Sequence, residues 1–163
     1  MDYSIRPISS EDRKAIMDIF NYYIENSYAA YPENSLPYQA FDMLLKMAEG
    51  FPHGTIEDQN GKIWGFGMLR THNPMPVFSQ TAEVTYFIHP DCTGKGLGYN
   101  LLCFLEKGAV EKGIKNILAN ISSLNVKSID FHKKNGFVEC GRFRNVAKKK
   151  GQIFDTVWMQ KEL

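Results

Sequence analysis

Apolar and polar residues follow a regular pattern in the first third of the chain. Alternation from Ser4 to Ile8 predicts a first strand, and Ser9 with Asp12 forms a capping-box pattern that opens a helix. Apolar residues at helical spacing give this helix one buried face: Ile16, Ile19, Phe20, Tyr23 and Ile24. Pro37 opens a second helix, which ends at Gly50.

The segment between these helices, Ser27 to Leu36, has aromatic residues and prolines without clear periodicity. Its length favours a functional loop that walls a pocket. Further on, Gly54–Glu57 and Lys62–Leu69 flank Asn60-Gly61, which is a strong sequence pattern for a β-hairpin. Thr71 to Ser79 is expected to be a loop.

The rest of the chain predicts a strand at Glu83–Ile88, a helix at Leu97–Lys112, a strand at Ile117–Ile121, a helix from Asn125 to Lys134, and strands at Phe137–Arg142 and Ile153–Gln160. The order is strand, two helices, three strands, helix, strand, helix, two strands. This order predicts an α+β fold, a mixed sheet with helices on its faces.

Composition limits the class of protein. The 163 residues suit one domain over 1–163, and 44% hydrophobic with 23% charged residues are ordinary for a soluble protein. We find no apolar run of membrane-spanning length and no secretion signal, so we expect a cytoplasmic protein without membrane contact. With a net charge of +1 and one basic run, Lys148–Lys150, nucleic acid is an unfavourable partner.

Three widely spaced cysteines (Cys92, Cys103 and Cys140) without a C-x-x-C pair indicate reduced thiols, and neither a disulfide framework nor a zinc cluster. His89 and Cys92 form an H-x-x-C pair, but two ligands do not make a metal site. We therefore expect no metal and interpret both as turn residues.

The most informative segment is a glycine-rich turn between a strand and a helix. Gly94, Gly96 and Gly98 let the backbone approach a ligand, and the unpaired N–H groups at the start of the next helix attract anions. A diphosphate would fit there. The alternative for such a turn is a structural bend without ligand. The pattern G-x-x-x-x-G-K-(S/T) of nucleoside triphosphatases is absent, and the dinucleotide pattern G-x-G-x-x-G fails, which leaves coenzyme A.

The turn Thr93-Gly94-Lys95-Gly96-Leu97-Gly98 resembles the (R/Q)-x-x-G-x-(G/A) motif of the GNAT superfamily, with Thr93 where arginine or glutamine is usual. A second stretch, Asn125 to Phe137, resembles the family's N-x-x-S-(I/L)-x-(L/F)-(H/Y)-x-K-x-G-F. The Glu83–Pro90 strand and the tail from Gly136 to Asp155 are similar to the phosphinothricin-acetyltransferase-like branch, and this resemblance covers nearly the whole chain.

The resemblance implies the GNAT fold, a central, mostly antiparallel mixed sheet with helices on both faces, and a homodimer. It also implies acetyl-CoA as the acetyl donor and a set of coenzyme-binding residues: Tyr86, Phe87, Ile88, Thr93, Gly94, Lys95, Gly96, Leu97, Gly98, Tyr99, Asn125 and Ser128. Glu83 would be the general base and His132 a proton donor to the leaving thiolate or a structural hydrogen-bonding residue. A backbone N–H at Phe87 or Ile88 would stabilise the thioester oxygen.

The implied function is transfer of acetyl to the primary amine of a small molecule, an amino acid or an analogue such as phosphinothricin, methionine sulfone or sulfoximine. Candidate substrate-binding residues are Tyr28, Tyr31, Glu33, His72, Phe78 and Thr85; for the first five the alternative is packing of the loop on the core. Two other functions stay open at this point: acetylation of protein N-termini or lysines, and binding of acyl-CoA without catalysis.

Overall fold

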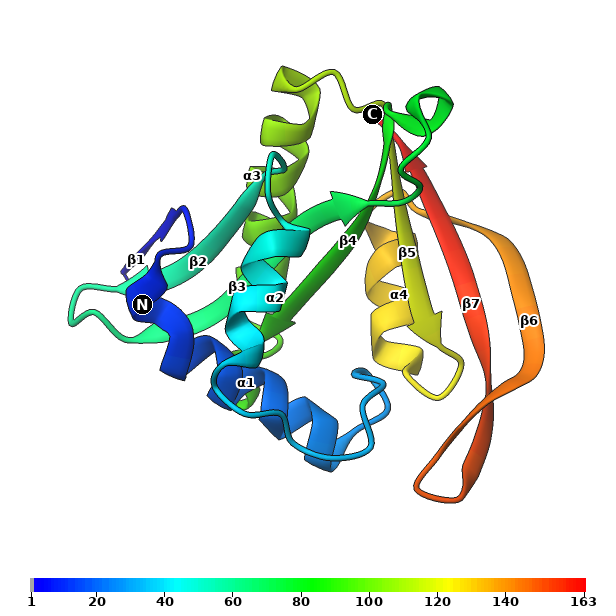
Figure 1. The fold of residues 1–163 in the computed structure, drawn as a ribbon, viewed down its shortest axis with the longest axis horizontal. Coiled ribbons are helices and arrows are strands. Elements are labelled where there is room, and N and C mark those ends of the chain that lie inside the picture. Colours follow the sequence, from blue (N-terminus) through cyan, green and yellow to red (C-terminus); the bar gives the residue numbers. More distant parts are fainter. Residues whose placement is uncertain (1) are drawn as a thin grey trace.

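The computed structural model describes residues 2–163, whose strands form one seven-stranded mixed sheet in the order β1-β2-β3-β4-β5-β7-β6 (Figure 1). The strands are β1 (Tyr3–Arg6), β2 (His53–Asp58), β3 (Ile63–Thr71), β4 (Thr81–Ile88), β5 (Asn116–Ser122), β6 (Val138–Lys149) and β7 (Gln152–Glu162). The α-helices are α1 (Arg13–Asn26), α2 (Ala40–Met47), α3 (Leu97–Glu111) and α4 (Val126–Lys134). The predicted α+β class and the predicted order of elements are confirmed.

The helices cover both faces of the sheet and bury two apolar clusters (Figure 1). On one face, the leucines of α3 pack with β4 and β5 residues such as Val84 and Ala119. On the other face, Ile16 of α1 and Phe41 of α2 pack with Phe66 of β3. Because side chains alternate along a strand, β3 contributes to both clusters, with Leu69 in the first and Phe66 and Met68 in the second.

The strands β4 and β5 form the one parallel pair among the described strands, and they pair only over Thr81–Glu83 with Asn116–Leu118. Beyond Glu83 the two strands diverge, which Figure 1 shows as a V-shaped opening of the sheet. Backbone groups that would join a continuous ladder are therefore exposed to the opening.

The last hairpin differs from the prediction. Strand β6 continues to Lys149, beyond the expected end at Arg142, and pairs with β7. Lys150 and Gly151 connect the two strands with φ of 49° and 77°, the positive values that a two-residue type I′ turn requires. Most of β6 is exposed, so its sequence lacks the apolar alternation that marks a half-buried strand.

None of the helices in residues 2–163 is long and apolar enough to cross a membrane. Over the same residues, no three His, Cys, Asp or Glu side chains gather in a group that could bind a metal ion.

Candidate active site

The glycine turn has the backbone of an anion cradle. Gly94 and Gly96 have φ of 75° and 81°, and Gly96 is the residue before the first turn of α3. A Cβ built on either glycine meets no atom within 4 Å, so the space in front of this turn is open. Alternating left-handed residues at a helix start direct successive N–H groups toward one point. The turn therefore fits the diphosphate of coenzyme A.

The side chains of this turn hold its shape. Lys95 Nζ donates to the backbone oxygen of Asp91 at 2.9 Å, and Thr93 Oγ1 donates to the backbone oxygen of Pro90 at 3.3 Å. Leu97 is buried in the core, so only its backbone belongs to the turn, whereas Tyr99 is exposed on α3. The donors that this turn offers to an anion are therefore main-chain N–H groups, because the side chains of Thr93 and Lys95 bond to backbone oxygens within the turn.

At the other side of the opening, Asn125 caps α4. Its Oδ1 accepts a hydrogen bond from the Ser128 N–H at 3.3 Å, as the sequence predicts for an N-cap. Asn125 and Ser128 therefore lie together at the start of α4, next to the end of β5.

The N–H groups of β4 alternate between its two neighbours. The His89 N–H donates to the backbone oxygen of Trp64 at 2.7 Å, on the β3 side. Since N–H groups alternate along a strand, Phe87 also faces β3, whereas Ile88 and Tyr86 face the opening toward β5. The Phe87 ring packs against the rings of Phe20 and Tyr23 at 5.2 Å. Of the two oxyanion donors left open by the sequence, this geometry favours Ile88.

His132 is buried and both of its ring nitrogens have partners. Nδ1 lies 2.6 Å from the backbone oxygen of Ser128, which can only accept, so Nδ1 carries the proton. Nε2 lies 2.5 Å from the Tyr86 hydroxyl and accepts from it. Burial lowers the pKa of His132, opposed in part by the bond to Ser128. This arrangement favours the structural role for His132 over that of a proton donor.

Glu83 is a buried carboxylate, 8% exposed, at the last paired position of β4 before the opening. Its Oε1 lies 3.4 Å from Nη2 of Arg70 on β3, and its Oε2 lies 3.7 Å from Nδ1 of His72. His72 Nδ1 is itself buried without a hydrogen-bond partner among the described residues. Glu83 is therefore buried, and its contacts with Arg70 and His72 are both long, so its oxygens keep capacity for a further hydrogen bond.

The predicted substrate-binding residues fall into two groups. His72 lies beside Glu83 and packs edge-on against Phe78 at 6.0 Å, and Thr85 shares the Glu83 face of β4. Tyr31 donates to Asn120 Oδ1 of β5 at 2.5 Å and therefore reaches across to the sheet. Glu33 instead accepts from the Lys150 N–H at the β6–β7 turn, so its contact lies at that turn.

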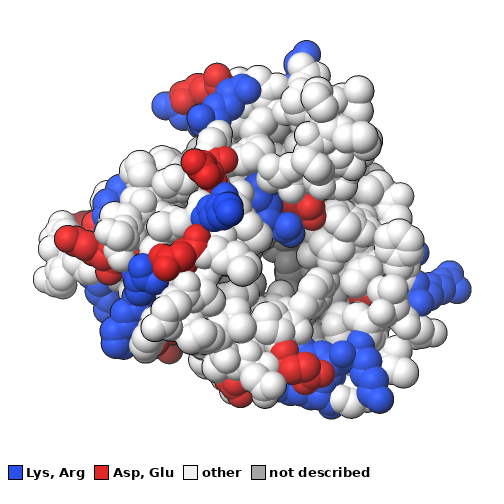
Figure 2. Space-filling view, in the orientation of Figure 1, with Lys and Arg blue, Asp and Glu red and all other residues white. Residues whose placement is uncertain are grey.

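Three residues of this region were not predicted: Arg70, Asn120 and Trp158. Trp158 lies opposite Asn120 in the β5–β7 register and packs edge-on against His72 at 6.2 Å. A chain of contacts thus runs from Tyr31 through Asn120 and Trp158 to His72. In the space-filling view the molecule is hollowed where β4 and β5 diverge, and a basic and an acidic side chain meet at the rim (Figure 2).

Comparison with known proteins agrees with this geometry. Residues 5–158 match the acetyltransferase (GNAT) domain family. The L-methionine sulfoximine/L-methionine sulfone acetyltransferase of Pseudomonas paraeruginosa is 31% identical over 100% of this chain and 96% of its own length. Among solved structures, YncA, an acetyltransferase from Salmonella typhimurium with its cofactor acetyl-CoA, has a TM-score of 0.92 and 27% identity, covering 100% of this chain and 95% of its own.

A ribosomal-protein-alanine N-acetyltransferase from Brucella melitensis has a TM-score of 0.91 and 29% identity, covering 98% of this chain and 99% of its own. These matches confirm the predicted GNAT fold, its phosphinothricin-acetyltransferase-like resemblance and acetyl-CoA as the donor. They also decide between an enzyme and a module that only binds the coenzyme. The chain belongs to the GNAT family and is an acetyl-CoA-dependent N-acetyltransferase.

Proposed function

We propose that this enzyme acetylates the primary amine of a small molecule, an amino acid or an analogue of the methionine sulfone, sulfoximine or phosphinothricin type. The observation that carries the proposal is Glu83, a buried carboxylate where β4 leaves β5 and on the sheet face that carries Arg70, His72 and Thr85. The relatives named for methionine sulfoximine and for phosphinothricin support the substrate class.

The chemistry requires a proton acceptor at this place. An aliphatic amine has a pKa of about 10.4 and is protonated at neutral pH, so it cannot attack until it loses a proton. Glu83 takes that proton, directly or through water. A well-placed base contributes about 10²- to 10⁴-fold in rate.

Other residues bind and orient the reactants. Acetyl-CoA supplies the acetyl group as a thioester. The turn at Gly94 and Gly96 would hold the diphosphate through main-chain N–H groups, and Asn125 and Ser128 at the start of α4 would hold the pantetheine arm. The Ile88 N–H, which faces the opening, is placed to bind the thioester oxygen.

A second candidate function is acetylation of protein N-termini, because the Brucella protein named for ribosomal-protein alanine is 29% identical. The contact between Tyr31 and Asn120 supports a small acceptor, since it joins the Ser27–Leu36 loop to β5 and a more closed site suits a small molecule better than a peptide.

The acceptor is identified by measuring thiol release from acetyl-CoA with a panel of amines: L-methionine sulfone, L-methionine sulfoximine, phosphinothricin, spermidine and a peptide with N-terminal alanine. We expect the highest kcat/KM with one of the amino-acid analogues. A higher value with the peptide would favour the second function, and thiol release with spermidine alone would contradict an amino-acid acceptor.

Two further predictions concern the assembly and the location. We propose a homodimer, supported by the long edge strand β6, which leaves apolar side chains such as Val138 and Phe143 69% and 60% exposed. Analytical ultracentrifugation tests this, because a monomer at micromolar concentration would contradict it. The cytoplasm stays a prediction from the sequence.

A further inference from the structure

The cation beside the proposed base has unused hydrogen-bonding capacity. Arg70 lies directly opposite Glu83 in the β3–β4 register, so both side chains project from the same face of the sheet. A guanidinium has five N–H donors, and the contact with Glu83 is a single one at 3.4 Å, longer than the 2.7–2.9 Å typical of a charge-assisted bond.

Arg6 shows how this protein satisfies an arginine with a structural role. Its guanidinium donates to both oxygens of Asp12 at 2.8 Å and to Glu57 at 2.6 Å. Arg70 makes no comparable set of bonds in residues 2–163, and its side chain is 33% exposed. Arg70 therefore lies near Glu83, but this single long contact uses only one of its N–H donors.

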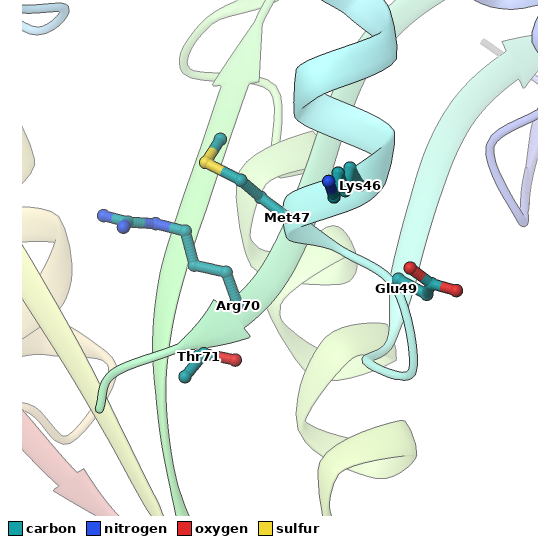
Figure 3. Close-up of a pocket in the computed structure, with 5 residues that line it drawn as sticks. All are labelled: Lys46, Met47, Glu49, Arg70 and Thr71. Carbon is teal, nitrogen blue, oxygen red and sulfur yellow. The ribbon is translucent and has the colours of Figure 1, made fainter. Parts of the chain in front are cut away.

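Arg70 also lines a cavity of about 340 Å³, together with Lys46, Met47, Glu49 and Thr71. Figure 3 shows the Arg70 side chain pointing away from Lys46 and Glu49, with Met47 alongside it. This volume is within the range of small-molecule sites. Arg70 therefore lies at the edge of this cavity, and its guanidinium is directed toward Glu83, which does not line the cavity.

We propose that Arg70 binds the carboxylate of the acceptor and thereby selects α-amino acids, and analogues with a free carboxylate, over simple amines and peptides. An α-amino acid carries its amine and its carboxylate on the same carbon, so both groups must be bound by neighbouring side chains. Arg70 binds a carboxylate through two parallel N–H donors, and Glu83 beside it takes the proton of the amine. This inference rests on the proposed function and adds the residue that sets its specificity.

The test compares kcat/KM for L-methionine sulfone and for its carboxamide, which keeps the amine and loses the negative charge. In the unaltered enzyme we expect the acid to be preferred. In Arg70→Met we expect kcat/KM for the acid to fall about 10- to 100-fold, the loss of hydrogen bonds to a charged group, and the value for the amide to change much less. Acetyl-CoA affinity, measured by calorimetry, shows that the variant is folded and should be unchanged.

A matched control is Lys46→Met, which removes the other cation lining the cavity. It should keep the preference for the acid. A proportional fall for acid and amide in Arg70→Met would show that Arg70 only holds Glu83 in place and would overturn the inference. So would loss of the preference in Lys46→Met.

Failure of the inference can be told apart from failure of the proposed function. Equal kcat/KM for acid and amide in the unaltered enzyme would overturn the role of Arg70 while small-amine acetylation stands. Acetylation of neither compound, with acetylation of the alanine peptide, would overturn both.

Discussion

The Tyr86 hydroxyl lies 2.5 Å from Nε2 of His132, and the two rings stack with centroids 5.6 Å apart. This pair links β4 to α4, the elements on the two sides of the opening in the sheet. Because Nδ1 already donates to Ser128, the imidazole is neutral and accepts the Tyr86 proton through Nε2. This hydrogen bond therefore connects the two sides of the opening, on the sheet face that α3 and α4 cover.

A neutral buried histidine makes stability depend on pH. Burial lowers the pKa of His132 in the folded protein below its ordinary 6.5. As the pH falls through 6.5, the unfolded chain binds a proton that the folded one does not, so the free energy of unfolding decreases on acidification. Urea unfolding between pH 7 and 5 should show a smaller slope for His132→Gln than for the unaltered protein. Burial also lowers the pKa of His53, so the difference between the two proteins is the measured quantity. Equal slopes would show that His132 does not contribute.

The glycine turn gives a prediction for coenzyme binding. Gly96→Val places a β-branched side chain at φ of 81°, where the left-handed backbone is strained and the open space belongs to the diphosphate. Calorimetry should show loss of measurable acetyl-CoA binding. Gly113 at the other end of α3 has φ of 77° and the same open surroundings, so Gly113→Val carries the same strain away from the site. Equal loss of affinity in both variants would contradict the assignment of the turn.

Lys149 anchors the loop that follows α1. Its buried ammonium donates to the backbone oxygens of Ile24, Ser27 and Ala30 at 2.7, 2.8 and 2.6 Å. Lys149→Met keeps the apolar stem but leaves buried oxygens without donors, so we expect the free energy of unfolding to fall by about 1–3 kcal/mol. The neighbouring Lys148 is exposed, and Lys148→Met should change it by less than about 0.5 kcal/mol. Equal stability of the two variants would argue against the anchor.

The sequence predicted the elements that have strong local patterns. The helix from Leu97 and the hairpin at Asn60-Gly61 were predicted within a few residues, because helical spacing and turn chemistry are local properties. The length of β6 was missed, since its residues pair with β7 while their side chains stay largely in solvent, and no apolar alternation results.

The candidate site could be predicted only in part. Glu83 and the glycine turn belong to one continuous strand–turn–helix segment, so the sequence alone could predict both. Arg70 is 13 positions from Glu83 and lies beside it only through the β3–β4 register. Trp158 reaches His72 from β7, a contact that depends on the order of strands in the sheet. Such relations between strands are set by the tertiary fold and leave no local pattern.

The proton acceptor is the central claim, and Glu83→Gln tests it most directly because it keeps the shape of the side chain while removing its basicity. Calorimetry should show unchanged acetyl-CoA binding, and thiol release with the best amine acceptor should fall by about 10²- to 10⁴-fold. Turnover equal to that of the unaltered enzyme, with the same coenzyme affinity, would contradict the role of Glu83 as the base.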